Sequence, residues 1–363
     1  MVKPKAHAGE NYREQWLVLA MLSLTLLNAI QGKNGFDHSS SFLNEIAWSI
    51  AYSVAATRLL SMKRELPALL AGSAPLLVYL VLCFVSTLWS VEPGITLKNS
   101  IELIGSTVVA LYIVASLKLA DFLSVLVVFF SASAILSLLL IVASPGRGRM
   151  FWGGGAWDGI YEEKNALGAA MALAIIVILS YLLRRRAKFK LAAAGALALC
   201  VGLLAGSNSV TAILDCGAVL CIGALAIACV SPNYGGVARA LAGIGATLAV
   251  AFAAAIGFNS DALYALIGRS QALSGRTDFW PYLYEAVKAR PIFGYGYGAF
   301  FRSPASRDYL SYYVIEAGGW SPYHAHNSFL QACLDTGYVG LASVVFLIIA
   351  GIVRAIRFFM RER

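Results

Sequence analysis

Ten apolar stretches, most of them close to 20 residues long, constrain the fold of this chain more than any other feature of its sequence. A helix needs about 20 apolar residues to cross the roughly 30 Å hydrocarbon core of a bilayer. The predicted spans cover residues 15–31, 41–60, 68–90, 97–117, 119–143, 164–183, 190–206, 208–230, 237–258 and 326–353. The sequence therefore predicts an all-α integral membrane protein, a polytopic helical bundle of about ten transmembrane helices.

The composition supports a membrane protein and excludes several soluble classes. Only 13% of the residues are charged and 59% are hydrophobic, whereas soluble domains carry about 25% charged residues. The six cysteines all lie in apolar stretches and form no CxxC pattern, so they predict no metal site and no disulfide framework. A net charge of +9 on so apolar a chain indicates a membrane rather than nucleic acid as the partner.

The distribution of charge between the predicted loops gives the orientation. With the N-terminus inside, the cytoplasmic segments carry a net charge of +12 and the external segments −2, as the positive-inside rule requires. The run RRRAKFK over residues 184–190 is the strongest single anchor. We therefore expect one transmembrane domain over residues 1–363, both termini in the cytoplasm and no cleaved signal peptide.

Two predicted external loops, 144–163 and 259–325, are longer than connections usually are. The second is rich in aromatic residues, which argues against disorder. Within it we expect a helix that Thr277 caps and that ends before Pro291. The following GYGYG segment, residues 294–298, is typical of a mobile loop, although its backbone N–H groups could also approach a phosphate.

Histidine and arginine are the residue types most able to do chemistry here. His324 and His326 lie where the long loop meets the last span; His326 could act as a proton acceptor, although a metal ligand or a helix cap is an alternative. Arg147, Arg149 and Lys164 lie with Arg276 on the side that the charge rule leaves poor in basic residues. Single basic residues at a membrane edge usually lie along its surface, but together these predict a diphosphate-bearing ligand.

Five short motifs together resemble one known family. They are WSVEP…TLK (89–98), YEEKNALG (161–168), SGRTDFW (274–280), ARPIFGYGYGAF (289–300) and HAHNSFLQACLDTGYVGL (324–341). In this order they resemble the O-antigen ligase and polymerase superfamily of bacterial envelopes, with a likeness to exopolysaccharide polymerases of the succinoglycan type. The resemblance extends over about residues 85–341.

The resemblance implies a GT-C-like membrane glycosyltransferase of the bacterial inner membrane, with a large, partly helical periplasmic loop over residues 259–325. It implies an inverting, metal-independent reaction without a cofactor. The donor would be an oligosaccharide on undecaprenyl diphosphate, and the acceptor a sugar of another repeat unit in a polymerase or lipid A–core in a ligase. The bilayer and other polysaccharide-assembly proteins are the further partners expected, and nucleic acid is not.

The resemblance also assigns roles to residues. It implies His326 and Arg276 as catalytic residues; a family motif that usually carries Arg or Lys matches residues 205–211, where this chain has Asn208. We expect the diphosphate to be bound by Arg147, Arg149, Lys164, Asn165 and Asn208. Further contacts to the acceptor or the loop are expected from His324, Tyr295, Tyr297 and Lys98.

Two other classes of function remain open from the sequence. A membrane transporter would suit ten spans and the intramembrane Asp215, because ionisable groups at depth often line a transport path. It would also predict inverted repeats and broken helices near the midplane, and neither is visible in the sequence. A non-catalytic scaffold would leave the histidine and arginine residues unexplained.

Overall fold

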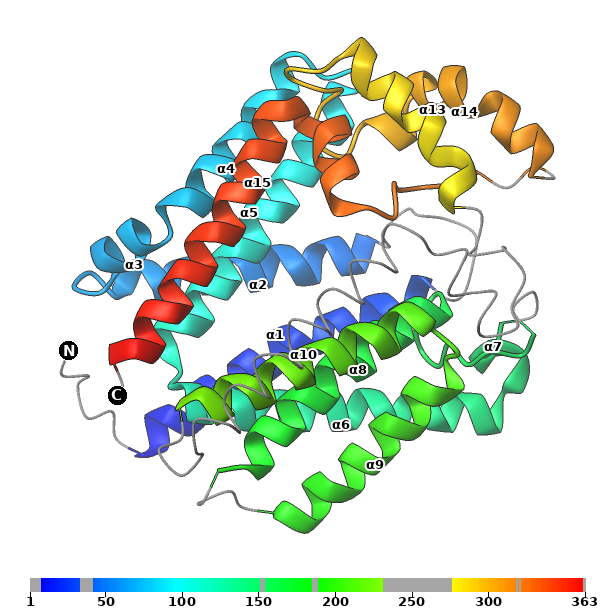
Figure 1. The fold of residues 1–363 in the computed structure, drawn as a ribbon. Helices are drawn as coiled ribbons and strands as arrows, with labels where there is room; N and C mark the ends of the chain where they lie inside the picture. Colours follow the sequence, from blue (N-terminus) through cyan, green and yellow to red (C-terminus); the bar gives the residue numbers. More distant parts are fainter. Residues whose placement is uncertain are drawn as a thin grey trace. The chain divides into compact units, whose positions relative to one another are not determined.

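The structure, a computed structural model, describes residues 8–32, 42–150, 154–184, 189–230, 276–317, 319 and 321–361. Helices dominate these residues, as Figure 1 shows. Within the described ranges, strand-like pairing is limited to an isolated antiparallel bridge between Arg149 and Trp157. The all-α expectation is confirmed for this part of the chain.

Each predicted span within the described residues contains a helix, although α1 begins seven residues before its predicted span and α15 ends eight residues after its own. Several helices begin at a proline, whose missing N–H needs no partner in the first turn. Their bounds are α1 (Ala8–Gly32), α2 (Phe42–Ser61), α3 (Leu66–Gly72), α4 (Ala74–Val85), η1 (Ser86–Leu88), α5 (Pro93–Ser116), α6 (Leu119–Ala143), α7 (Pro145–Gly148), α8 (Lys164–Leu182), α9 (Lys190–Gly206), α10 (Val210–Val230), α13 (Arg276–Ala289), η2 (Phe300–Arg302), α14 (Pro304–Glu316) and α15 (Ser328–Arg361).

Four of the described helices are long and apolar enough to cross a membrane: α5, α6, α8 and the Ser328–Phe358 part of α15. The predicted span 68–90 is broken, because α3 and the helix that follows it meet at an angle of 74°. Pro75 lies in the first turn of α4 just after this break. The α9 helix and the Val210–Leu225 part of α10 are apolar but shorter, and the predicted span 237–258 lies outside the described residues. The total of ten spans stays a prediction.

The chain divides into two compact units, each described here by itself. Unit 1 comprises Met1–Ser53 with Ile113–Ser260, and unit 2 comprises Val54–Tyr112 with Asp261–Arg363. Two of the three boundaries fall inside α2 and α5, and the third, after residue 260, lies outside the described residues; each unit is therefore built from segments distant in the sequence.

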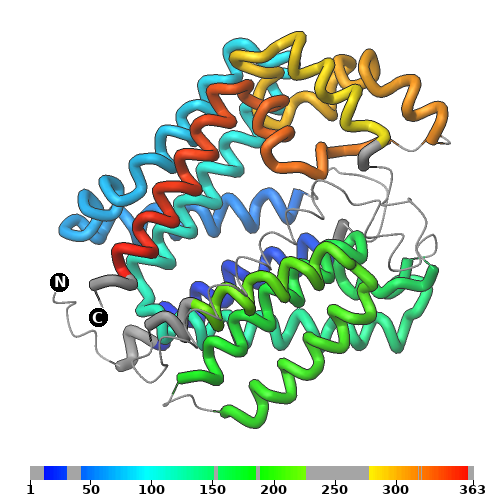
Figure 2. The backbone as a smooth tube through the Cα atoms, in the orientation of Figure 1, coloured from blue at the N-terminus to red at the C-terminus, as the bar shows by residue number. Residues whose placement is uncertain are grey.

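Unit 1 is organised around α8, which packs against α6, α9 and α10. Its core is mainly aliphatic and aromatic, and Leu167, Met171 and Ile178 of α8 are fully buried in it. In the backbone tube of Figure 2, α8 lies beside these three helices. Gly168 allows the close approach of the α10 start, since a Cβ there would meet Ser209 and Ala212.

Unit 2 has a second core that is unusually aromatic. Residues of α13, α14, α15 and the glycine-rich segment contribute to it, including the fully buried Phe279, Phe300 and Leu334. The rings of Phe279 and Tyr313 pack at a tilt with centroids 5.5 Å apart, and those of Tyr295 and Phe300 pack edge to face at 4.9 Å. The expectation that the aromatic loop is folded is thus confirmed over residues 276–317.

Candidate functional site

The two histidines of the last motif lie directly before α15, in unit 2. Their ring centroids are 3.7 Å apart at an angle of 71°, and Tyr323 stacks on His324 at 4.5 Å. His326 is half-buried and has a φ of 51°, in the left-handed region that few non-glycine residues adopt. Among the described residues, the Nδ1 atom of His324 has no hydrogen-bond partner.

The residues on both sides of His326 are fixed by hydrogen bonds. The carbonyl of Ala325 accepts from Trp280 Nε1 at 2.9 Å, and its N–H donates to Gln331 Oε1 at 3.0 Å. On the other side, Asn327 caps α15, because its Oδ1 accepts from the N–H groups of Phe329 and Leu330 at 3.1 and 3.2 Å. The backbone of His326 is therefore held between two anchored neighbours.

The glycine-rich segment 294–298 packs against a break in α15. Thr336 and Gly337 have non-helical backbone angles there, which frees carbonyl groups on α15. Tyr295 N and Gly296 N donate to the carbonyls of Leu334 and Asp335 at 2.8 and 2.9 Å. After the break, Tyr338 N donates to the carbonyl of Pro291 at 2.7 Å.

These contacts overturn both interpretations of the GYGYG segment. Besides the two bonds to α15, Gly294 N donates to the carbonyl of Arg290 at 3.2 Å, Tyr297 N to Ser86 Oγ at 3.1 Å and Gly298 N to Asp335 Oδ1 at 3.1 Å. All five N–H groups have partners within the protein, so none is left to approach a phosphate. The segment is also tied down at every residue, which contradicts a mobile loop.

The two tyrosines of this segment differ in exposure. Tyr295 is only 3% exposed, donates its hydroxyl hydrogen to the carbonyl of Ala286 at 2.8 Å, and lies under the guanidinium of Arg290. Tyr297 is half-buried, and burial raises its pKa to about 12. Both phenols therefore stay neutral at physiological pH, and Tyr295 serves the packing of unit 2.

The remaining candidates of unit 2 are less defined. α13 begins at Arg276, one residue before the predicted cap Thr277, and ends at Ala289 before Pro291 as expected. The side chain of Arg276 lies outside the described part of the structure. Lys98 is exposed on the second turn of α5.

In unit 1 three segments distant in the sequence meet at one corner. Trp157 N donates to the carbonyl of Gly206 at 2.9 Å, and a Cβ at Gly206 would overlap the Trp157 ring. The Arg149 guanidinium lies 5.9 Å from the centre of that ring. Asn165, on the first turn of α8, accepts from Ser209 Oγ at 2.9 Å. The residues expected to bind diphosphate lie on these segments, here called the basic corner: Arg147, Arg149, Lys164, Asn165 and Asn208.

The basic corner combines favourable and unfavourable features for an anion. Arg147, Arg149 and Asn208 are exposed, and the N-terminus of α8 at Lys164 adds a partial positive charge. Glu162 and Glu163 lie just before that helix, and their negative charges disfavour the binding of an anion there. Asn208 has a φ of 52°, a left-handed conformation that asparagine tolerates better than most other residues.

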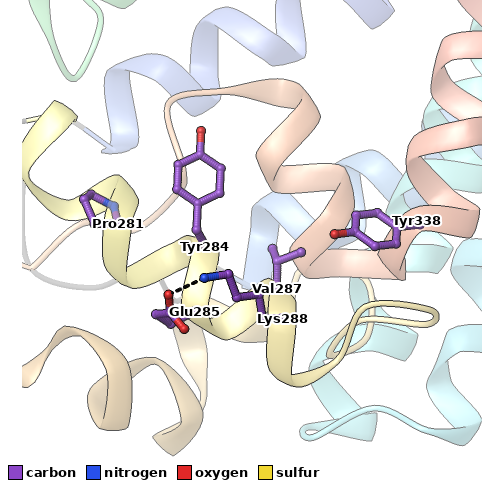
Figure 3. A pocket seen from close by; sticks show the side chains of 6 residues that line it. All are labelled: Pro281, Tyr284, Glu285, Val287, Lys288 and Tyr338. Atoms are coloured by element: carbon purple, nitrogen blue, oxygen red, sulfur yellow. Dashed lines mark hydrogen bonds and ion pairs between the residues drawn. The ribbon is translucent and has the colours of Figure 1, made fainter.

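One pocket in each unit is lined by described residues other than the candidate residues. In unit 2 a pocket of about 400 Å³ lies between α13 and α15, beside the ion pair of Lys288 and Glu285 (Figure 3). In unit 1 a groove of about 1040 Å³ runs along α6 and α9. The described residues contain no group of three or more His, Cys, Asp or Glu side chains that could hold a metal ion.

Sequence reasoning did not single out Gln331 and Asp335, which link the histidine loop to the glycine-rich segment. Gln331 Nε2 donates to Asp335 Oδ1 at 2.9 Å, and Asp335 is only 4% exposed. The sequence signal that could have identified them is an amide and an acid four positions apart in the mostly apolar first part of α15.

The apolar helices and the packed bundle of each unit define a multi-pass membrane protein. A family profile described as O-antigen ligase matches residues 162–345, about half of the chain, so the protein belongs to the O-antigen ligase family. The expected family is thereby confirmed. The family match covers both the basic corner of unit 1 and the histidine loop of unit 2.

A relative with a related assignment is the exopolysaccharide production protein ExoQ of Rhizobium meliloti (strain 1021). It is 27% identical to this chain over 279 residues. The match covers 75% of this chain and 62% of ExoQ, so the chain spans less than two thirds of the length of that relative. No solved structure matches the chain.

Proposed function

We propose that the protein polymerises exopolysaccharide or O-antigen repeat units, moving a glycan from undecaprenyl diphosphate to a sugar hydroxyl on the periplasmic side of the inner membrane. The family match and the likeness to an exopolysaccharide production protein support this class of reaction. The observation that carries the proposal is the half-buried His326, whose neighbours are anchored on both sides. A general base must be held in this way to act on one hydroxyl.

The proposed reaction is an inverting displacement at the anomeric carbon. The acceptor oxygen forms a bond to that carbon while the bond to the diphosphate oxygen breaks. His326 accepts the proton of the acceptor hydroxyl, and the electron pair leaves with undecaprenyl diphosphate. Histidine suits this role because its ordinary pKa lies near neutrality.

The proposal assigns the leaving group to basic residues rather than to a metal or a cofactor. Arg276 neutralises the charge that develops on the diphosphate, since a guanidinium offers two parallel N–H donors to phosphate oxygens. The basic corner binds the diphosphate through Arg147, Arg149 and Lys164, helped by the amides of Asn165 and Asn208. His324, Tyr297 and Lys98 are proposed to contact the acceptor. Tyr295 was expected to share this role, but its side chain is buried and unsuited to it.

The orientation is part of the proposal. Both termini would lie in the cytoplasm, the site in the periplasm, and residues 259–325 would form one periplasmic insertion within a single domain of residues 1–363. The charge distribution of the predicted loops supports this orientation. The bilayer and other polysaccharide-assembly proteins are the proposed partners. A reporter that is active only in the periplasm should be inactive when fused to the C-terminus.

The substrate is tested by incubating the purified protein with a carrier-linked repeat unit alone. Longer carrier-linked chains are the expected product of a polymerase. The profile description favours one second candidate, a ligase, which would form no product until lipid A–core is added. Movement of the intact carrier-linked unit across a vesicle membrane, without any new glycosidic bond, would contradict both and favour a transporter.

A further inference from the structure

A chain of side-chain hydrogen bonds connects the histidine loop to the glycine-rich segment in unit 2. Ala325 N donates to Gln331 Oε1 at 3.0 Å, and Gln331 Nε2 donates to Asp335 Oδ1 at 2.9 Å. The same carboxylate oxygen accepts from Gly298 N at 3.1 Å. Two residues of one helix thus bridge two loops separated by more than twenty residues in the sequence.

The spacing of the two residues explains how one helix can form this bridge. Gln331 and Asp335 are four positions apart on α15, so their side chains lie on the same face, one turn apart. The side-chain oxygen of Gln331 accepts from Ala325 N in the histidine loop, and its side-chain nitrogen donates to Asp335. Glutamine is the side chain of this length that can accept at one end and donate at the other.

Asp335 is the buried end of the bridge. Its side chain is 4% exposed, and its backbone carbonyl also accepts from Gly296 N at 2.9 Å. It therefore holds the glycine-rich segment at two points, through its main chain and its side chain. The break at Thr336 and Gly337 follows at once, which is what leaves this carbonyl free to accept.

The bridge ends one residue from the proposed base. Ala325 is fixed by Gln331 on its N–H and by Trp280 on its carbonyl, and the next residue is His326. The left-handed backbone of His326 depends on restraint from its surroundings, since an unrestrained histidine rarely adopts it. A shift of about 1 Å in a catalytic group can cost about 10²-fold in rate.

We infer that Gln331 and Asp335 are positioning residues, which set the place of the His326 side chain by tying its loop to the glycine-rich segment. This inference rests on the proposed function, in which His326 accepts the proton. Neither residue touches the substrate in this account; they act through the backbone of Ala325.

Four variants of the full-length protein test the inference. Gln331→Met removes both bonds of the amide at nearly constant volume, and Asp335→Ala removes the shared acceptor. Asp335→Asn keeps an oxygen where both donors point. Ser343→Ala is the matched control, because it removes one side-chain hydrogen bond from the same helix, to the carbonyl of Val339, and neither residue belongs to the bridge.

The measurement is the rate of chain extension at varied concentrations of the carrier-linked repeat unit. We expect Gln331→Met and Asp335→Ala to lower kcat by about 10-fold to 10²-fold, with KM for the donor within about twofold of wild type. Asp335→Asn should retain most of the wild-type kcat, and Ser343→Ala should have the wild-type kcat. Should Gln331→Met fail to fold, Gln331→Glu replaces it, since it keeps the acceptor for Ala325 N and loses the donor to Asp335.

A double-mutant cycle with His326→Ala separates positioning from general stability. If Gln331 acts through His326, Gln331→Met should lower the rate little further once His326 is absent. An equal fall in both backgrounds, or a wild-type kcat for Gln331→Met, would overturn the inference. A wild-type rate for His326→Ala would instead refute the proposed function. Failure of the inference can therefore be distinguished from failure of the proposed function.

Discussion

The break in α15 depends on a glycine that no other residue can replace without strain. Gly337 has a φ of 68° and a ψ of −162°, a region that only glycine readily occupies. A side chain here costs about 1–3 kcal/mol in backbone strain alone. A Cβ would also overlap the carbonyl of Ile292, so the segment before the glycine-rich turn would have to move away.

That movement would disrupt the two hydrogen bonds that join the first residues of α15 after the break to Pro291 and Ile292. Tyr338 N donates to the carbonyl of Pro291 at 2.7 Å, and Val339 N to that of Ile292 at 3.4 Å. Each such bond contributes about 0.5–1.5 kcal/mol net. We therefore expect Gly337→Ala to lower the stability of unit 2 by about 2–6 kcal/mol.

Gly351→Ala is the matched control on the same helix. A Cβ there meets nothing within 4 Å, and its backbone is ordinary helix, so alanine should stabilise by about 0.5–1 kcal/mol. Thermal unfolding of both variants in one detergent is the assay, with loss of chain-extension activity for Gly337→Ala as a second readout. Equal melting temperatures for the two variants would refute the account of the break.

Two further predictions concern the ligand-binding residues. Ser209→Ala removes the hydroxyl that Asn165 accepts from and should raise KM for the carrier-linked donor several-fold, with kcat unchanged; an unchanged KM would show that this contact does not shape the basic corner. Arg276→Lys keeps the charge but loses the two-pronged guanidinium, so we expect kcat to fall by at least about 10-fold. A near-normal rate in the same assay would mean that only the charge of Arg276 matters.

The helix positions could be predicted from the sequence because each apolar stretch has the length that a bilayer demands. The α6, α8 and α9 helices match their predicted ranges to within one residue. The bend between α3 and α4 was missed, although Gly72 and Pro75 flank it, because hydropathy alone does not report direction.

The glycine-rich segment shows why the site was harder to predict than the helices. Its sequence is compatible with a mobile turn, a phosphate cradle or a docked segment, and local residues cannot separate these. The partners that decide are Ser86 and the carbonyls of Leu334 and Asp335, which are distant in the sequence. The histidines were found because their chemistry is rare in this chain, whereas Gln331 gains its role only through contacts that the fold creates.

In the proposed reaction, His326 accepts the proton of the acceptor hydroxyl. The most direct test compares single-turnover extension of a carrier-linked repeat unit by wild type, His326→Ala and His7→Ala, each purified in the same amount. We expect a rate about 10²–10⁴-fold lower for His326→Ala and a wild-type rate for His7→Ala. Chain extension by His326→Ala at the wild-type rate would contradict this expectation.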